Sequence, residues 1–538
     1  MEKQNSRRNI LMPILFSLIL VAGIGAGYLL SRVSGKTHEG NPVIDKLLSV
    51  IDYVEMEYVD TISKTDFVEA ALPQILLELD PHSQYIPASE QQSMSEPLEG
   101  NFDGIGVQFN IQEDTVVVVN VISGGPSHKR GILAGDRIVK VNDTLIAGVK
   151  ISNDKVMKKL KGPKGTKVML GIGRKGEKTL LSFEITRGQI PLYSIESSYM
   201  IREDIGFVKI NKFSKITTHE FKKAVTRLKR KGMKKIIIDL RGNGGGYMDA
   251  AVNLADEFLT DKQLIVYTYG KSRPKTNYFS TQKGFCIDLD VAILIDETSA
   301  SASEIVAGAI QDNDRGTIIG RRSFGKGLVQ EPVVFKDGSE LRLTIARYYT
   351  PTGRCIQKPY TKGSADYYYE LGERLMHGEL EEADSIKFSD SLRYTTPKGR
   401  TVYGGGGIMP DIFIPLDTAG YTTYLRAVIN KGLVYKFAFQ YADNNRKKLS
   451  GFQDPEKLEF YLNGQNLSAE FNRFAALQGI KINPASDTNA KAALLLNTQL
   501  KAYIARNILD DKGFYPIWHK VDDAVLKAVD VLEKGKAL

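Results

Sequence analysis

Cysteine and histidine are scarce in this chain of 538 residues, and their scarcity excludes several kinds of site. The two cysteines, Cys286 and Cys355, cannot form a disulfide framework or a four-cysteine metal site, although a single bridge between them stays open. The six histidines are scattered and include no HExxH pair, the spacing that places two zinc ligands on one helix face. We therefore expect neither a metal nor a cofactor, and other side chains must carry the chemistry.

Signatures of nucleic-acid binding are also missing, although the formal net charge is +9. The densest basic run, at 222–235, falls on a helix pattern that places Phe221, Val225 and Leu228 on one face. A solvated helix face explains such a run without any partner. Zinc-finger spacing, an RNA-binding aromatic signature and a glycine-rich RNA clamp are all absent from the sequence. We expect no nucleic-acid partner.

The N-terminus has the pattern of an export segment. Lys3, Arg7 and Arg8 precede an uncharged run at 10–30, which has about the length needed to span a bilayer. Positive charge ahead of the run predicts a cytoplasmic N-terminus. Small residues inside the run, AGIGAG, leave a cleaved signal peptide as an alternative. In both cases we expect the body of the chain outside the cytoplasm, on the periplasmic side, and the uncleaved form anchored in the cytoplasmic membrane.

The remaining chain changes character several times, and its length suggests about three or four domains. The pattern is helical up to LDPHSQYIP, then rich in glycine and β-branched residues, and then alternates strands with helices. Such alternation predicts a largely parallel sheet covered by helices. A charged, irregular segment at 362–400 reads as an insertion without a role that we can name. The expected segments are 1–36 (stub with anchor or signal peptide), 37–100 (helical), 101–189 (β-rich), 190–417 (α/β core) and 418–538 (helical extension).

Two glycine-rich stretches come close to nucleotide-binding motifs and fail. GRRSFGKG at 320–327 nearly spells a phosphate-binding loop, but Gly327 stands where a Ser or Thr must reach magnesium. The residues that follow, LVQEPVVF, are typical of a strand, whereas a phosphate loop opens a helix. In RGNGGG, Tyr247 stands where the dinucleotide fingerprint needs its third glycine. A nucleotidase remains only a remote alternative.

A serine and a lysine are the candidate reactive groups. Ser301 lies between the apolar strand VAILID and the helix SEIVAGAIQ, and it fits a capping box with Glu304. A serine at such a turn lies near free backbone amides and the positive end of the helix dipole, which suits an oxyanion. It needs a base, and a lysine serves if burial keeps it neutral. Lys326 lies among Phe324, Gly325, Gly327 and Leu328; an ordinary capping serine and a surface lysine are the plainer interpretation.

Six motifs together resemble the carboxy-terminal processing, or tail-specific, serine proteases. They are SASASEIVAGAIQD, SFGKGLVQ, DLRGNGGG, LDPHSQY, YYTPTGRCIQ and GGGGIMPDI, and the resemblance spans about 43–416. In that family the catalytic lysine follows the serine by 25 positions and a glutamine follows the lysine by four. Lys326 lies 25 positions after Ser301, which selects Ser301 over Ser299 and Ser303, and Gln330 lies four further on.

The resemblance implies a role for each matching residue. Ser301 would be the nucleophile, neutral Lys326 the general base and then the general acid, and Gln330 the residue that orients the lysine. The backbone N–H of Ala302 would form the oxyanion hole with one from the glycine turn, Gly245 being chosen over Gly244 and Gly246 without a decisive argument.

The resemblance also implies a fold. It predicts a protease core with a mainly parallel sheet and helices, of the crotonase or Clp type, an inserted PDZ domain at 101–189, a helical N-terminal segment and a helical C-terminal extension. In the PDZ domain, amides at Gly104, Ile105 and Gly106 would receive a terminal carboxylate, with Ile105 and Val107 near the last side chain. The substrate would add a strand to the sheet.

The expected function is therefore an exported serine endopeptidase that recognises free, apolar C-terminal tails of proteins or peptides. The main alternative is a PDZ protein that binds such tails without cleaving them. The sequence leaves open whether an adaptor or a second copy of the chain takes part.

Overall fold

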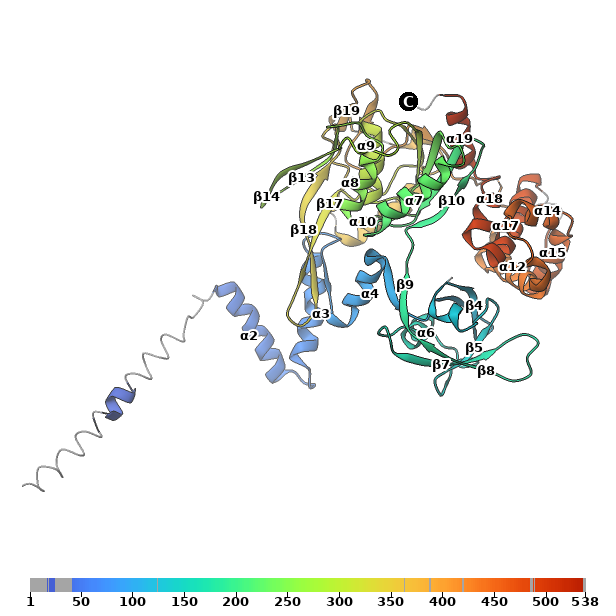
Figure 1. Cartoon of the computed structure of the whole chain (residues 1–538). Coiled ribbons are helices and arrows are strands. Elements are labelled where there is room, and N and C mark those ends of the chain that lie inside the picture. Colours follow the sequence, from blue (N-terminus) through green and yellow to red (C-terminus); the bar gives the residue numbers. More distant parts are fainter. Residues whose placement is uncertain are drawn as a thin grey trace, which may run out of the picture. The chain divides into compact units, whose positions relative to one another are not determined.

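The computed structural model describes residues 17, 19–24, 41–122, 124–361, 363–386, 389–418, 420–483, 487 and 489–535 (Figure 1). No helix among these residues is both long and apolar enough to cross a membrane. The predicted anchor or signal peptide, the run at 10–30, lies outside them except for residues 17 and 19–24. The chain divides into two compact units, Met1–Leu76 and Leu77–Leu538, each of which is described by itself.

The N-terminal segment is helical, as predicted. Asn41 caps its first long helix by accepting a hydrogen bond from the Val43 N–H, and Pro42 occupies the first turn, where its missing N–H costs nothing. Gly100 ends the last helix in a left-handed conformation with φ of 81°. The elements are α2 (Pro42–Glu57), α3 (Lys64–Leu77), β1 (Gln84–Ile86) and α4 (Ala88–Glu99).

The β-rich segment has its own apolar core and contains a six-stranded sheet and a two-stranded sheet. Alternate residues of its strands point inward, so that Val116, Val118, Leu170 and Ile172 are buried together. Its pairs are all antiparallel. The elements are β2 (Asn101–Gly104), β3 (Val107–Gln112), β4 (Thr115–Val121), α5 (Pro126–Lys129), β5 (Arg137–Val141), β6 (Thr144–Leu145), α6 (Asn153–Leu160), β7 (Lys167–Gly173), β8 (Leu181–Thr186) and β9 (Gly188–Pro191).

The α/β core contains one sheet in the order β10-β11-β12-β15-β16-β21, in which every pair except β10 with β11 is parallel. Helices follow three of its strands, as the alternating pattern predicts. The elements are β10 (Ile195–Met200), β11 (Ile205–Ile210), α7 (Thr217–Lys229), β12 (Lys235–Asp239), α8 (Met248–Asp256), β15 (Asp290–Ile295), α9 (Ala302–Asp312), β16 (Thr317–Gly320) and β21 (Ile412–Phe413).

Both faces of this sheet are covered, which is why its strands are almost continuously apolar. Ile236 and Ile238 of β12 pack with residues of α7, α8 and α9 on one face. Ile237 points to the other face, where it packs with Val525 and Leu532 of the C-terminal helix α19 (Asp523–Glu533). The last helix of the predicted extension therefore covers one face of the parallel sheet.

The prediction of a mainly parallel core holds for this six-stranded sheet but is wrong for the second sheet of the core. A second, five-stranded sheet is antiparallel throughout, and antiparallel pairs predominate in the described chain. Short connections cause the difference, because hairpins join β13 to β14 and β17 to β18 where a parallel pair would need a crossover. The elements are β13 (Leu264–Gly270), β14 (Arg273–Phe279), β17 (Leu328–Val334) and β18 (Glu340–Tyr349), joined by β1.

The segment at 362–400 is more regular than its composition suggests. It contains the helix α10 (Ser364–Met376), on which Tyr367 and Arg374 are buried. These two residues lie seven positions apart, on one face of the helix. A short hairpin follows, formed by β19 (Arg393–Thr395) and β20 (Thr401–Tyr403).

The C-terminal extension is helical, as predicted, and has its own apolar cluster. Before α19 it contains α11 (Thr423–Asn430), α12 (Leu433–Asn444), α13 (Arg446–Leu449), α14 (Pro455–Asn463), α15 (Leu467–Leu477), α17 (Ala490–Leu509) and α18 (Asp511–Trp518).

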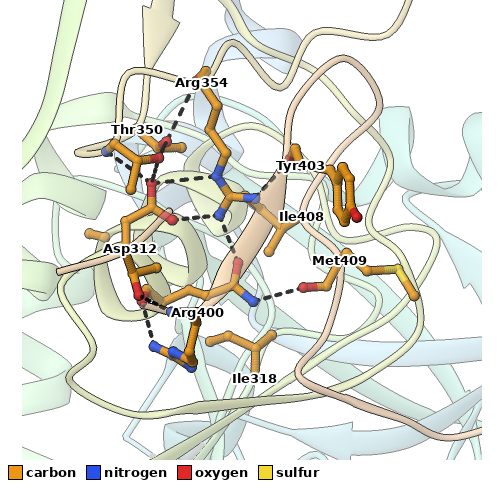
Figure 2. Close-up of polar contacts among 12 residues, drawn as sticks. Asp312, Ile318, Thr350, Arg354, Arg400, Tyr403, Ile408 and Met409 are labelled. Carbon is orange, nitrogen blue, oxygen red and sulfur yellow. Dashed lines mark hydrogen bonds and ion pairs between the residues drawn. The ribbon is translucent and has the colours of Figure 1, made fainter. Parts of the chain in front are cut away.

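A buried ion pair fixes the C-terminal end of α9 (Figure 2). Arg354 and Asp312 are both fully buried, with Nη2 2.6 Å from Oδ1. Nη2 of Arg354 also donates to Gln311 Oε1 at 2.7 Å, and Nη1 donates to the carbonyl of Tyr403 at 2.9 Å. Nε2 of Gln311 in turn donates to the carbonyl of Met409. The arrangement ties the motifs YYTPTGRCIQ and GGGGIMPDI to the helix that begins at Ser301.

Candidate active site

Ser301 lies at the sharp turn between β15 and α9 in a strained backbone conformation. Its φ is 56° and its ψ is −112°, a region that residues other than glycine rarely adopt. Such strain persists only where the surroundings enforce it, and it is common at reactive residues. The Ser301 N–H donates to Glu304 Oε2 at 2.8 Å, within the predicted capping box.

The neighbouring serines of the SASAS repeat point elsewhere. Ser299 and Ser303 are fully buried. The Ser299 hydroxyl donates to the carbonyl of Leu240, and the Ser303 hydroxyl donates to the carbonyl of Asn243, each at 2.9 Å. Both therefore hold the glycine-rich turn that follows β12. Ser301 alone of the three lines the cavity described next.

A cavity of about 460 Å³ brings Ser301, Lys326 and Gln330 together. The side-chain amine of Lys326 donates to Gln330 Oε1 at 2.9 Å. Burial lowers the pKa of Lys326, opposed by the nearby carboxylates of Asp80 and Glu304. The strand β17 follows Lys326 directly, so the phosphate-loop alternative, which requires a helix there, is wrong. The cavity walls include the apolar side chains of Leu98, Met248, Ile305, Leu328, Val329, Pro332 and Val334.

Two buried side chains join the serine turn to the lysine loop. The Glu304 carboxylate accepts hydrogen bonds from the N–H groups of Ser301, Gly325 and Lys326 and from the Ser323 hydroxyl. Burial raises the pKa of this carboxyl even though four donors surround it. The hydroxyl of Tyr348 donates to the carbonyl oxygens of Lys326 at 2.6 Å and Ser301 at 3.1 Å. The turn at Ser301 and the loop at Lys326 are thus held by shared partners.

Gln330 is oriented from its far side by the LDPHSQY motif. Its side-chain N–H donates to the backbone carbonyl of His82, which leaves Oε1 to face Lys326. The Asp80 carboxylate accepts from the N–H groups of His82 and Ser83 and from the hydroxyls of Ser83 and Thr344. Burial lowers the pKa of His82 to about 4, so its imidazole is neutral at physiological pH. Sequence reasoning missed this contact of His82, because a backbone oxygen makes it.

The predicted oxyanion donors lie next to Ser301, with one complication. The N–H of Ala302 is the first of helix α9 and has no acceptor within the helix. Gly245 lies so close that a β-carbon there would stand 2.8 Å from the Ser301 β-carbon. Its N–H, however, donates to Asn243 Oδ1 at 2.9 Å, while Gly244 and Gly246 line the cavity. The choice among the three glycines therefore stays a prediction.

An ion-pair network centred on Arg241 lies at the start of the glycine-rich turn that follows β12. Arg241 donates to both carboxylate oxygens of Asp239, at 3.0 and 2.7 Å, and to both of Asp522, each at 2.9 Å. Asp522 also caps the first turn of α19. The C-terminal extension, to which the motifs gave no function, thus contacts the glycine-rich turn that follows β12.

The four predicted tail-binding residues line one small apolar pocket of about 100 Å³. Gly104, Ile105, Gly106 and Val107 form the bend between β2 and β3, and Gly106 has φ of 77°. Helix α6 and the residue after it also line the pocket, through Met157, Leu160 and Lys161. Sequence reasoning missed these three residues. The Lys161 amine lies 4.7 Å from the ring centroid of Phe102 and pairs with Glu96 at 2.5 Å.

Among the residues that the structure describes, no cluster of three or more His, Cys, Asp or Glu side chains has the arrangement of a metal site. The chemistry on view is that of a hydroxyl, a buried amine and backbone N–H groups. These groups and the strand-to-helix turn that bears the hydroxyl define a serine peptidase. A PDZ-type domain stands ahead of it in the chain.

Comparison with known proteins supports both assignments. The model of "Peptidase family S41" matches residues 204–365 and the PDZ domain model matches residues 104–185. A third model, a family of unknown function called DUF8443, matches residues 424–510.

Individual relatives carry explicit names. "Carboxy-terminal-processing protease" of Bartonella bacilliformis is 34% identical over 362 residues, covering 64% of this chain and 82% of the relative. "Carboxy-terminal processing protease CtpB" of Bacillus subtilis is 32% identical over 326 residues, covering 60% and 67%. Among solved structures, the photosystem II D1 C-terminal processing protease is 24% identical, covers 68% of this chain and 92% of that one, and has a TM-score of 0.34. The chain belongs to the family of carboxy-terminal processing serine proteases with a PDZ domain.

Proposed function

We propose that this serine peptidase is an exported endopeptidase that selects proteins by their C-terminal tails and cleaves them with a dyad of Ser301 and Lys326. The observation that carries the proposal is the shared cavity, in which the buried amine of Lys326 is held by Gln330 beside the strained turn of Ser301. We further propose that the core, with helices on both faces of its parallel strands, is of the crotonase or Clp type.

The reaction follows from the groups that line the cavity. Neutral Lys326 takes the hydroxyl proton of Ser301 as the oxygen attacks the scissile carbonyl carbon. The N–H of Ala302 and one of the glycine N–H groups stabilise the oxyanion. The ammonium of Lys326 then protonates the leaving amine as the C–N bond breaks, which leaves an acyl-serine and a neutral lysine. Water attacks the ester with Lys326 again accepting a proton, and the carboxylic acid product leaves as Ser301 is re-protonated.

Gln330 is expected to tune the base. Gln330→Ala removes the acceptor that orients the amine and should lower kcat by about ten- to a hundredfold with little effect on KM. Gln330→Glu keeps the shape but places a negative charge beside Lys326, which raises the pKa of the lysine. Because the neutral form is the active one, the rise of activity with pH should move to higher pH. A Gln330→Glu profile that stays in place or moves to lower pH would contradict the assignment.

Tail selection is expected to reside in the pocket at Gly104, Ile105, Gly106 and Val107. A charge-assisted hydrogen bond to the terminal carboxylate contributes about 1.5–3 kcal/mol, so amidating a substrate's C-terminus should slow cleavage by about ten- to a hundredfold. A tail of aspartates, which places charge in an apolar pocket, should act similarly. Equal rates on free, amidated and acidic tails would remove tail selection from the proposal.

Gly106 offers a matched test of the same pocket. A β-carbon at this position would stand 2.9 Å from Ile190 Cδ1, and the φ of 77° disfavours any side chain. Gly106→Val should therefore weaken discrimination between free and amidated tails while Ser301 keeps its reactivity toward a small acylating probe.

Export is the remaining part of the proposal, and it rests on Lys3, Arg7, Arg8 and the apolar run at 10–30. The full-length protein should fractionate with membranes, and protease added outside the cytoplasmic membrane should digest its body. Recovery of the intact chain in the soluble cytosol would contradict export.

A further inference from the structure

Helix α10 lies against the loop that carries Lys326, although it begins at the edge of the matched peptidase region and extends beyond it. The Arg374 side chain is 2% exposed. Its Nη1 donates to the carbonyl of Ser323 at 2.8 Å, Nη2 donates to the carbonyl of Phe324 at 3.3 Å, and Nε donates to Glu370 Oε1 at 2.6 Å. A buried guanidinium therefore satisfies two backbone carbonyls just before the lysine.

A second cation locks the same loop to α10. The Lys358 amine pairs with Glu370 Oε2 at 2.9 Å, and its side chain is 3% exposed. It lies 4.0 Å from the ring centroid of Phe324 and 4.3 Å from that of Tyr367, a cation–π arrangement with both rings. The two rings also meet edge to face, with centroids 5.7 Å apart. Phe324, two residues before Lys326, is thus fixed on several sides.

The other end of α10 reaches the segment that orients Gln330. The Tyr367 hydroxyl lies 2.9 Å from His82 Nε2, and the Tyr368 hydroxyl donates to the carbonyl of Pro81 at 2.9 Å. The backbone carbonyl of His82 accepts a hydrogen bond from the Gln330 side chain, and Gln330 in turn accepts one from the Lys326 amine. Tyr367 is therefore linked to Lys326 through His82 and Gln330. The helix therefore grips both the lysine loop and the support of its glutamine.

We propose that α10 is a positioning element of the active site: Arg374 holds the lysine loop, and Tyr367 holds His82 so that Gln330 presents its oxygen to the Lys326 amine. The inference rests on the proposed dyad. Neither residue contacts the cavity, so both act through other groups, and their loss should lower kcat and leave KM nearly unchanged. If α10 only filled space, loss of these side chains would lower the stability of the protein but would not lower kcat at constant KM.

Tyr367→Phe in the full-length protein is the primary test, because it removes one hydroxyl and keeps the buried ring. We expect kcat to fall about five- to tenfold with unchanged KM and a Tm within a few degrees. Tyr369→Phe is the matched control, since Tyr369 lies on the same helix and is 58% exposed. Arg374→Lys, which keeps the charge but not the two-carbonyl fork, should also lower kcat.

A double-variant cycle separates positioning from general destabilisation. If Tyr367 acts through Gln330, Tyr367→Phe should have little further effect in a Gln330→Ala background. The inference would be overturned if Tyr367→Phe lowered kcat by a further five- to tenfold in the Gln330→Ala protein. It would also be overturned if neither Tyr367→Phe nor Arg374→Lys changed kcat in the otherwise unmodified protein. The proposed dyad is tested separately by Ser301→Ala and Lys326→Ala, so failure of the dyad can be distinguished from failure of the positioning role of α10.

Discussion

Ser301→Ala is expected to lower peptide hydrolysis by at least about a thousandfold while leaving the fold intact. Only Ser301 of the SASAS repeat lines the cavity. Ser299 and Ser303 donate to the carbonyls of Leu240 and Asn243, so their replacement should disturb the glycine turn and cause smaller, partial losses. The measurement is kcat/KM on an unfolded substrate with an apolar tail, with thermal unfolding as the control. Substantial activity in Ser301→Ala, with loss in Ser299→Ala or Ser303→Ala, would identify a different nucleophile.

The lysine should be equally indispensable. Lys326→Ala removes the base, and Lys326→Arg substitutes a guanidinium that stays protonated, so both should inactivate to the same extent. In the unmodified enzyme, burial lowers the pKa of Lys326, so activity should rise through that pKa and stay high on the alkaline side. A histidine base would instead give a rise near about pH 6.5. An active Lys326→Arg variant would contradict the role of general base.

The second large effect is expected on stability, at the opposite end of α9. Arg354→Met leaves the fully buried carboxylate of Asp312 without its cation, and breaking a buried pair in this way costs about 3–5 kcal/mol. Denaturant unfolding should show the loss as a lower midpoint. Adding Asp312→Asn, which removes the charge and keeps hydrogen-bonding capacity, should recover part of it.

Arg347→Met on strand β18 is the matched control, because Arg347 is exposed and its guanidinium donates a hydrogen bond to the Tyr360 hydroxyl at 3.0 Å. Its effect should stay within about 1 kcal/mol. A cost of similar size in Arg347→Met and Arg354→Met would mean that the buried pair has no special weight.

The candidate residues Ser301, Lys326 and Gln330 could be chosen from the sequence because the family resemblance ties each of them to a position along the chain. Ser301 and Lys326 follow β15 and β16 of the parallel sheet, whereas Gln330 lies on β17 of the antiparallel sheet. All three line one cavity, which only the structure shows. Glu304 was recognised only as half of a capping box. The Glu304 carboxylate also accepts hydrogen bonds from the N–H groups of Gly325 and Lys326, about twenty residues further along the chain. A local sequence pattern cannot reveal such a contact.

Other parts could not be read from the sequence because they act through backbone atoms or distant contacts. The backbone carbonyl of His82 accepts a hydrogen bond from Gln330, nearly 250 residues away in the chain, and a residue of any type has such a backbone oxygen. The charged, irregular composition of 362–400 does not indicate helix α10, because the buried face of this helix consists of tyrosine and arginine and not of aliphatic residues. Helix α19 has an ordinary apolar stripe, and nothing local indicates that the stripe covers the catalytic sheet.

The central claim is that Ser301 is a nucleophile activated by Lys326, and covalent labelling tests it most directly. The protein would be treated with a fluorophosphonate or a peptidyl phosphonate ester, digested and mapped by mass spectrometry, in parallel with Ser301→Ala and Lys326→Ala. We expect a single adduct on Ser301, absent from Ser301→Ala and formed at least about a hundredfold more slowly in Lys326→Ala. An adduct on Ser299 or Ser303, or labelling of Ser301 at an undiminished rate without Lys326, would contradict the account.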